Sequence, residues 1–375
     1  MAIKELEKGK KYKITIYKGR IGSKEKFDYY TFYGSKKEAE LKEAEYKNGL
    51  RNNTYLTPNK KDMNELINEW LEYKKNKLAI KTYKGYCNLC KNISHSIGHI
   101  KLLNINVKVL EDFYNDLMNN TNLSTKTIRH YQTLINTMLN DAKKWGYIFD
   151  NPNEKVERIK VIKKEIKYYT PDEVQKLLKA IENEPLKYKA LIYLALDTGA
   201  RRGEITGLTW DDVDFENKRI NINKTTQYVT GVGVFEKSTK NETSNRVIYI
   251  SDITSNILLR YRKEQLENKL KLGNKWGNSN RVFTTDYGFD MFPNTPSAIL
   301  TNIIKKHNLK YINFHALRHT SISLLANSNV PIQLVSKKAG HSSLKTTTEI
   351  YSHFYDDTFK ELANTMNNIL TKEAK

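Results

Sequence analysis

The stretch FHALRHT, residues 314–320, places two histidines and an arginine on one predicted helix. His315 and His319 are four residues apart and therefore share a helix face. This spacing is found in zinc sites, but Ala316 replaces the glutamate of an HExxH motif, and Arg318 would repel a divalent cation. A phosphate site is the alternative, because a guanidinium and an imidazole one turn apart can donate to the same phosphate. A packed histidine beside a solvated one, with no ligand, is the third interpretation.

The charge balance of the chain indicates a polyanionic partner. Its 375 residues include 63 Lys and Arg against 42 Asp and Glu, a formal net charge of +21. Nucleic acid is the first candidate partner of so basic a chain, and an anionic membrane surface is the second. No apolar run approaches the roughly 18 residues of a membrane span, and the N-terminus lacks the apolar core of a signal peptide. Because the chain has only two cysteines, we expect a soluble, cytoplasmic protein of about two or three domains.

Residues 1–57 are predicted to form a small module of strands and one helix. KYKITIYK at 11–18 alternates polar and apolar residues, as a half-buried strand does, and KFDYYTFYG at 26–34 follows as a second strand after a turn. SKKEAELKEAEYKNGL at 35–50 has a serine cap and a late glycine, which predict a helix. The TPNK stretch at 57–60 ends the module.

The pattern of residues 61–150 predicts an all-helical domain. Its four expected helices lie near 62–77, 80–97, 107–119 and 124–145. Cys87 and Cys90 fall inside the second helix, and without a second pair they predict packing rather than a redox or zinc site. Residues 151–169 start with a helix-stopping proline and carry a charge run, which predicts a linker.

Residues 170–375 are predicted to form a mixed α/β domain. TPDEV, which starts at Thr170, has the threonine cap, the proline and the acids that open a helix. Short strands are expected in KRINI, QYVTGVGVF and RVIYI, within 218–250, and an amphipathic tail helix is expected within 356–375. The expected helices that follow the first one lie near 187–198, 252–271, 295–307, 315–328, 331–339, 343–352 and 357–371.

Upstream in this domain, LDTGARRGEITGLTWDDVD at 196–214 places arginines at the start of a helix. Gly199 ends one predicted helix, and Arg201 and Arg202 begin the next turn. A helix N-terminus beside an arginine is an anion site. A solvated arginine pair in a helix-loop-helix is the simpler alternative for this stretch alone.

Downstream, KKAGHSSLKTTTEIYSH at 337–353 places a tyrosine on a predicted helix. Gly340 and His341 precede a serine pair that makes a good N-cap for this helix. Taken alone, Tyr351 is one of 24 tyrosines, so packing is its simplest interpretation.

Taken together, the three stretches resemble the sequence boxes of the tyrosine recombinases, the phage integrase family. TGAR at 198–201, followed by Glu204, is similar to the first arginine box of that family. HALRHT at 315–320 is similar to the H-x-x-R-H box, and AGHSSLKTTTEIYSH at 339–353 to the G-H…Y box. Order and spacing agree with the family over about residues 170–355.

The resemblance implies a multidomain fold that is mainly α with small β-sheets. Residues 1–57 would form a three-stranded β-sheet plus helix that binds arm-type DNA. Residues 61–150 would form a four-helix, SAM-like core-binding domain, followed by the linker at 151–169. Residues 170–375 would form the mixed α/β catalytic domain of a tyrosine recombinase, including the tail helix.

The resemblance also implies roles for individual residues. Arg201 and Arg318 would clamp the scissile phosphate. His315 would assist as proton acceptor or phosphate ligand, His341 would complete the pocket, and Tyr351 would attack the phosphorus. Glu204 would support the first arginine, and Arg202 would contact a neighbouring DNA phosphate. The implied pocket and nucleophile are Arg201, His315, Arg318, His341 and Tyr351.

A lysine on a β-hairpin usually acts in this family as the general acid toward the leaving 5′-oxygen. In KSTKNETSNRVIYI, residues 237–250, the register back from Arg246 points to Lys240, with Lys237 as the alternative. The segment departs from the family pattern just after Lys240 and at Tyr249, where a proline is common.

DNA-binding side chains are implied in both N-terminal domains. A basic, tyrosine-bearing strand could enter a major groove, and the start of the last core-binding helix offers a second face, unless that helix is simply solvated. The candidates are Lys13, Tyr17, Lys18 and Arg20 on or just beyond the strand, and Lys126 and Arg129 on the helix.

The implied activity is site-specific DNA recombination through a 3′-phosphotyrosine intermediate, which integrates and excises a mobile element without metal, ATP or another cofactor. Implied partners are double-stranded attachment sites of core and arm type, a homotetramer in which the tail docks on a neighbour, an excisionase and a host DNA-bending protein. The implied location is the nucleoid of a bacterial host. Three alternatives stay open: a Xer-like or transposon resolvase, a type IB topoisomerase, and a DNA-binding relative that has lost catalysis.

Overall fold

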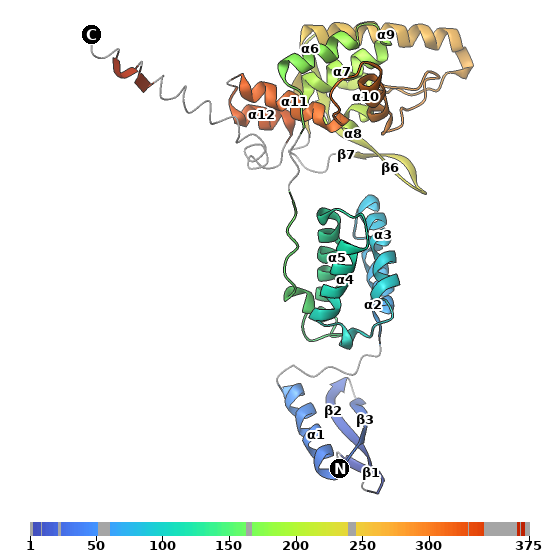
Figure 1. The fold of residues 1–375 in the computed structure, drawn as a ribbon. Coiled ribbons are helices and arrows are strands. Elements are labelled where there is room, and N and C mark those ends of the chain that lie inside the picture. The colour runs from blue at the N-terminus through green and yellow to red at the C-terminus, as the bar shows by residue number, and fades with distance from the viewer. Residues whose placement is uncertain are drawn as a thin grey trace. The chain divides into compact units, whose positions relative to one another are not determined.

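The computed structural model describes residues 3–8, 10–21, 24–51, 61–162, 167–238, 245–328, 330–340, 366–367 and 369–371. Contacts divide the chain into two units, Met1–Lys163 and Lys164–Lys375. The parts shown in Figure 1 are described one by one below.

The N-terminal part is an antiparallel sheet with one helix on one face (Figure 1). Its strands are β1 (Ile3–Glu7), β2 (Lys11–Ile21) and β3 (Lys24–Tyr33), in the order β1-β2-β3, and its helix is α1 (Lys36–Arg51). The alternation of β2 buries Tyr12, Ile14 and Ile16 against α1, which contributes Ala39. This confirms the expected three-stranded sheet plus helix, although the pattern of the sequence had located only two of the strands.

The helical part contains four helices, as expected. They are α2 (Met63–Lys75), α3 (Ile80–Ile97), α4 (Val107–Asn119) and α5 (Thr125–Lys144). Asp62 and Glu65 form a capping box on α2, and Asn106 and Ser124 cap α4 and α5. Cys90 is a free cysteine buried in the shared core, in keeping with packing.

The start of the expected linker packs on this helical part. A short 3₁₀ turn at Pro152–Glu154 follows Asn151, whose Nδ2 donates to Asn136 Oδ1 at 2.8 Å. Gln132 of α5 donates to the carbonyl of Glu157 at 2.9 Å and accepts from the backbone N–H of Ile159 at 3.2 Å. The Gln132 side-chain amide of α5 thus forms hydrogen bonds with backbone groups of this segment. The first residues of the expected linker are therefore packed, although their charge run suggested a free linker.

The described residues of the C-terminal part form helices and two small sheets, one of which is a hairpin that projects from the helices (Figure 1). Strands β4, β5 and β8 form one sheet and β6 and β7 form a hairpin. The elements are α6 (Pro171–Ala180), α7 (Leu186–Thr198), α8 (Arg202–Gly207), β4 (Val213–Asp214), β5 (Arg219–Ile222), β6 (Lys224–Val229), β7 (Gly233–Ser238), β8 (Arg246–Tyr249), α9 (Asp252–Leu272), α10 (Thr295–Lys306), α11 (Phe314–Asn327) and α12 (Ile332–Ala339).

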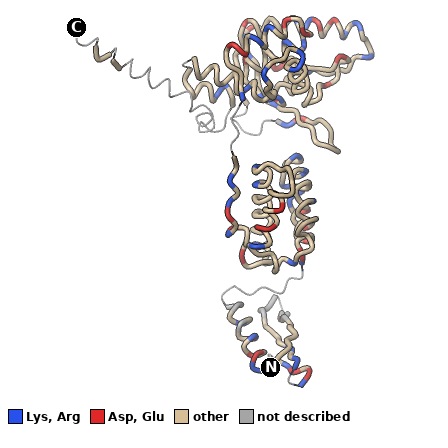
Figure 2. Tube along the Cα trace, viewed as in Figure 1, with Lys and Arg blue, Asp and Glu red and all other residues tan. Residues whose placement is uncertain are grey.

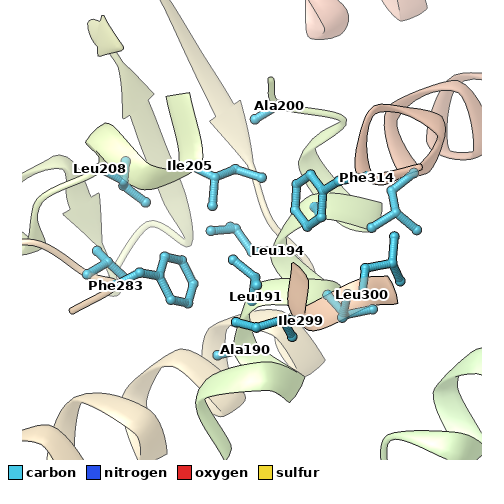
Figure 3. Close-up of a cluster of buried hydrophobic side chains, with 14 of the residues drawn as sticks. Ala190, Leu191, Leu194, Ala200, Ile205, Leu208, Phe283, Ile299, Leu300 and Phe314 are labelled. Carbon is cyan, nitrogen blue, oxygen red and sulfur yellow. The ribbon is translucent and has the colours of Figure 1, made fainter. Parts of the chain in front are cut away.

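Helix α7 supplies the centre of the C-terminal core. Leu191 and Leu194 lie among apolar side chains of α10 and α11, including Leu300 and Phe314 (Figure 3). Ala200 and Ile205 belong to the same core and lie on either side of Arg201 in the sequence. The core therefore fixes the backbone on both sides of Arg201.

One expectation for this part changes. QYVTGVGVF is a hairpin rather than one strand, because Gly231 takes a left-handed φ of 80° in the turn between β6 and β7. The short helix α8 begins at Arg202, where the sequence predicted a helix start. The helix expected at 343–352 lies outside the described residues, and of the one at 357–371 only Met366–Asn367 and 369–371 are described, as helix.

No helix among the described ranges is long and apolar enough to cross a membrane.

Candidate active site and DNA-binding surfaces

The turn between α7 and α8 carries the first arginine box. Gly199 ends α7 with φ of 60°, which favours glycine, and a Cβ there would come within 3.3 Å of Ser321 Oγ on α11. The next residue but one, Arg201, is the N-cap of α8, and its backbone N–H donates to Glu204 Oε2 at 2.9 Å. The close approach of α11 and the glutamate together fix where the Arg201 side chain starts.

Arg201 is held on two sides and still reaches solvent. Its Nη1 donates to Glu204 Oε1 at 2.9 Å and its Nη2 donates to the carbonyl of Gly340 at 3.0 Å. Its side chain is 40 % exposed, whereas that of Glu204 is 3 % exposed. A partly exposed, preoriented guanidinium is suited to bind a phosphate.

Glu204 is a buried carboxylate that stays ionised. Burial by itself raises its pKa, but the hydrogen bonds and charges of Arg246 and then of Arg201 keep the pKa below its ordinary value. Its position beside Arg201 matches the supporting role that the resemblance implies.

Helix α11 brings the second box to the first. Arg318 is buried, and its Nη1 donates to the carbonyl of Gly199 at 2.8 Å. The pKa of His315 is lowered, first by partial burial and then by the charges of Arg318, Arg201 and Arg202. Boxes that are far apart in the sequence thus converge on one basic cluster, which we call the arginine cluster: Arg201, Arg202, His315 and Arg318.

The two histidines of FHALRHT share a face and touch. Their ring centroids are 4.9 Å apart and the rings are nearly perpendicular. Burial, then His315 and Arg318, lower the pKa of His319 to about 4. Among the residues that the structure describes, no three or more His, Cys, Asp or Glu side chains form a group that could hold a metal ion.

We expect His319 to make the unliganded protein less stable below neutral pH. The unfolded state takes up this proton near pH 6.5 and the folded state only near 4, so this contribution to stability is present above pH 6.5 and is lost as the pH falls toward 4. The loss would reach at most about 3 kcal/mol. Chemical unfolding at several pH values would measure it, with His319→Gln as the comparison. Equal pH dependence in both proteins would contradict the expectation.

Arg202 of the arginine cluster also contacts α10. Its Nη1 donates to Ser297 Oγ on α10 at 2.7 Å. The contact orients this arginine, and its proposed contact with a neighbouring DNA phosphate stays a prediction.

The structure does not describe the remaining predicted catalytic residues. Lys240, His341 and Tyr351 lie outside the described residues. Lys237, the alternative general acid, lies near the end of β7 and pairs with Thr225 of β6. The choice between the two lysines therefore stays open.

Arg246 is a site residue to which the sequence analysis gave no role of its own. It lies on β8, its side chain is 6 % exposed, and its Nη2 donates to Glu204 Oε2 at 2.8 Å. The alternation of RVIYI could have revealed it, because Arg246 shares the buried face of β8 with Ile248. An arginine on the buried face of a strand needs a carboxylate partner, because an unpaired buried charge is costly.

The face of the N-terminal sheet that α1 leaves uncovered is basic and aromatic. It carries Lys13 and Tyr17 of β2 with Tyr29 and Tyr33 of β3, and the three tyrosines are at least half exposed. The Nζ of Lys13 lies 4.2 Å from the ring centroid of Tyr29. Tyr29 and Tyr33 were not among the candidates, because only the first strand was searched for DNA-binding side chains. Lys18 and Arg20 lie on β2 as predicted, and their side chains are outside what is described.

The start of α5 presents one of its two predicted DNA-binding side chains to solvent. Lys126 is exposed in the first turn. Arg129 instead donates to Gln132 Oε1 at 3.0 Å, the amide that also holds residues 157–159. Figure 2 shows both basic and acidic residues along the extended segment after the helices.

The family comparisons agree with this geometry. Residues 167–358 match the phage integrase family, and residues 62–158 match the phage integrase SAM-like domain. The chain therefore belongs to the phage integrase family, the tyrosine recombinases, and the expected class and fold are confirmed.

Individual relatives place the chain among integrases. It is 30 % identical to a XerC-like tyrosine recombinase of Caldanaerobacter subterraneus, over 96 % of both chains. It is 27 % identical to the ICEBs1 integrase of Bacillus subtilis, over 75 % of both chains. The integrase of transposon Tn1549, solved with a circular intermediate DNA, is 21 % identical with a TM-score of 0.69 and matches 81 % of this chain and 99 % of that one.

Proposed function

We propose that this protein is a site-specific integrase that cuts and rejoins DNA to move a genetic element. The observation that carries the proposal is the convergence of Arg201, His315 and Arg318 from two distant boxes on one partly exposed basic cluster. A phosphodiester is anionic, and attack at phosphorus increases the charge on its oxygens. Preorganised arginine and histidine donors stabilise that charge without a metal ion.

In the proposed reaction, Tyr351 Oη attacks the scissile phosphorus, and the bond from phosphorus to the 5′-oxygen breaks. The tyrosine proton passes to His315, whose lowered pKa leaves it neutral and able to accept. Lys240 gives a proton to the leaving 5′-oxygen. The product is a 3′-phosphotyrosine and a free 5′-hydroxyl, and attack by the 5′-hydroxyl of a partner strand reverses the same steps. Neither ATP nor water is consumed.

The two N-terminal parts are proposed to select the DNA. Residues 1–57 would bind arm-type sites through the uncovered sheet face, and residues 61–150 would bind the core site beside the catalytic domain at 170–375. The relatives support attachment-site binding, since the Tn1549 integrase was solved on DNA. A homotetramer, an excisionase and a host DNA-bending protein complete the proposal. The N-terminal sheet argues against a two-domain resolvase as the alternative.

The proposed function is tested by trapping the full-length protein on a nicked duplex that carries the core sequence from the ends of the encoding element. A covalent adduct at the 3′ side of the nick, formed in EDTA and without ATP, is the expected result. No adduct, or an adduct that needs a metal ion, would reject the mechanism. Relaxation of supercoiled DNA by single protomers, without pairing of two sites, would favour the topoisomerase alternative.

We expect Lys13→Ala to weaken arm-site binding through the loss of one phosphate contact. The affinity should fall for all sequences alike, and the slope of log affinity against log salt should drop by about 1. Lys36→Ala is the matched control, because Lys36 is exposed on α1, on the covered side of the sheet. Fluorescence anisotropy over a range of salt concentrations measures both quantities. Equal losses in the two variants would show that the uncovered face is not the binding surface.

A further inference from the structure

Arg246 is a buried arginine that contacts two separate segments of the proposed active site. Its Nη2 donates to Glu204 Oε2 on α8 at 2.8 Å, and its Nε donates to the carbonyl of Lys338 at the end of α12 at 2.8 Å. It opens β8, shortly after Lys240 in the chain. One side chain therefore joins β8, the strand after the candidate general acid, to α8 and to the end of α12.

The contact with α12 continues into Gly340. This residue ends α12 with φ of 68°, and a Cβ on it would lie 2.8 Å from Arg246 Nη1 and 3.0 Å from the guanidinium carbon. From another direction, Arg201 Nη2 donates to the carbonyl of Gly340 at 3.0 Å. Arg246 and Arg201 together fix the peptide that leads into His341.

Glu204 links the same two arginines electrostatically. Oε1 accepts from Arg201 at 2.9 Å and Oε2 accepts from Arg246 at 2.8 Å. If a buried carboxylate had a single arginine partner, that guanidinium alone would have to balance its charge. Because Arg246 already balances the carboxylate, the charge of the more exposed Arg201 stays available for a DNA phosphate.

We propose that Arg246 is a positioning residue, which holds Glu204 and Gly340 so that Arg201 faces the scissile phosphate. The inference rests on the proposed function and adds to it a part that none of the sequence boxes contains. Arg246 acts through these neighbours and does not touch the DNA.

A double-mutant cycle on single-turnover cleavage of the nicked duplex tests this role. Arg246→Lys keeps the charge but cannot bond Glu204 and the Lys338 carbonyl at once. We expect cleavage to slow by about 10²-fold, the size typical of a misplaced catalytic group, while DNA affinity and the thermal midpoint stay near wild type. When Arg201 is already lysine, the same change should add little, because the group that it positions has gone.

Gly340→Ala tests the contact between Arg246 and the end of α12 by changing α12 instead of the arginine. It should slow cleavage as Arg246→Lys does and be equally non-additive with Arg201→Lys. Gly146→Ala is the matched control, since Gly146 has a similar φ of 73° but a Cβ added there would meet no atom within 4 Å. This control separates backbone strain from displacement of the guanidinium.

The outcomes are distinguishable. Full activity of Arg201→Lys would reject the proposed phosphate clamp itself, whatever Arg246 does. Normal cleavage by Arg246→Lys, or effects of Arg246→Lys and Arg201→Lys that simply add, would overturn the positioning role. Unfolding of both Arg246→Lys and Gly340→Ala would assign Arg246 to stability alone and would overturn it as well. Non-additive loss of cleavage with intact folding and DNA binding is the expected result.

Discussion

Tyr351→Phe is expected to abolish covalent capture of DNA while leaving DNA binding intact. The substitution removes only the phenolic oxygen, so the shape of the side chain is kept and the nucleophile is lost. Cleavage should therefore fall to the background of the assay. Denaturing gels of the nicked duplex measure the adduct, and gel shifts measure binding.

Tyr355→Phe is the matched control, because it removes a phenolic oxygen from the same segment of the chain. It should form the adduct at the wild-type rate. An adduct that persists in Tyr351→Phe and disappears in Tyr355→Phe would move the nucleophile. Persistence in both would exclude a phosphotyrosine at either position.

Arg318→Lys is expected to slow cleavage by about 10²- to 10³-fold, the cost of losing one preorganised donor to a reacting oxyanion. The buried guanidinium donates to the Gly199 carbonyl through Nη1, and its N–H groups form a rigid planar fork that matches a phosphate. A lysine ammonium is a point donor on a flexible stem and cannot reproduce that fork. The single-turnover rate on the nicked duplex measures the effect.

Arg262→Lys provides the comparison for this change. Arg262 is exposed on α9, with its guanidinium carbon 5.4 Å from the ring centroid of Trp210, away from the arginine cluster. Its replacement should leave the cleavage rate unchanged. A wild-type rate in Arg318→Lys, with the protein folded, would remove Arg318 from the proposed phosphate clamp.

Much of the architecture was predictable because it depends on local patterns. The caps at Asp62 and Ser124 and the 3.6-residue periodicity set the helices of the second part to within a few residues. Strand β1 was missed, since it is too short to show a period. The β6–β7 hairpin was read as one strand because its turn residue, Gly231, was not recognised as a left-handed position.

The residues of the candidate site also divide into those that local patterns predict and one that only the structure shows. The spacing of the family's sequence boxes predicted Arg201, His315 and Arg318 as candidate site residues. Each lies on or beside a helix that the local sequence specifies. Arg246 belongs to no box, and its role follows from a buried register on β8 and from partners on α8 and α12. A sequence pattern records which face of a strand a side chain occupies, but it does not record which carboxylate lies opposite.

The sequence by itself determined the class of this protein, most of its described helices and the candidate residues of the proposed phosphate site, because helix periodicity, caps and box spacing are local properties. Only the tertiary structure decided that α11 packs against Gly199, that Glu204 is shared between two arginines, and that Arg201 and Arg246 meet at Gly340. These contacts join segments that are distant along the chain. They depend on how the core around Leu191 and Leu194 brings the helices together, which no local pattern contains.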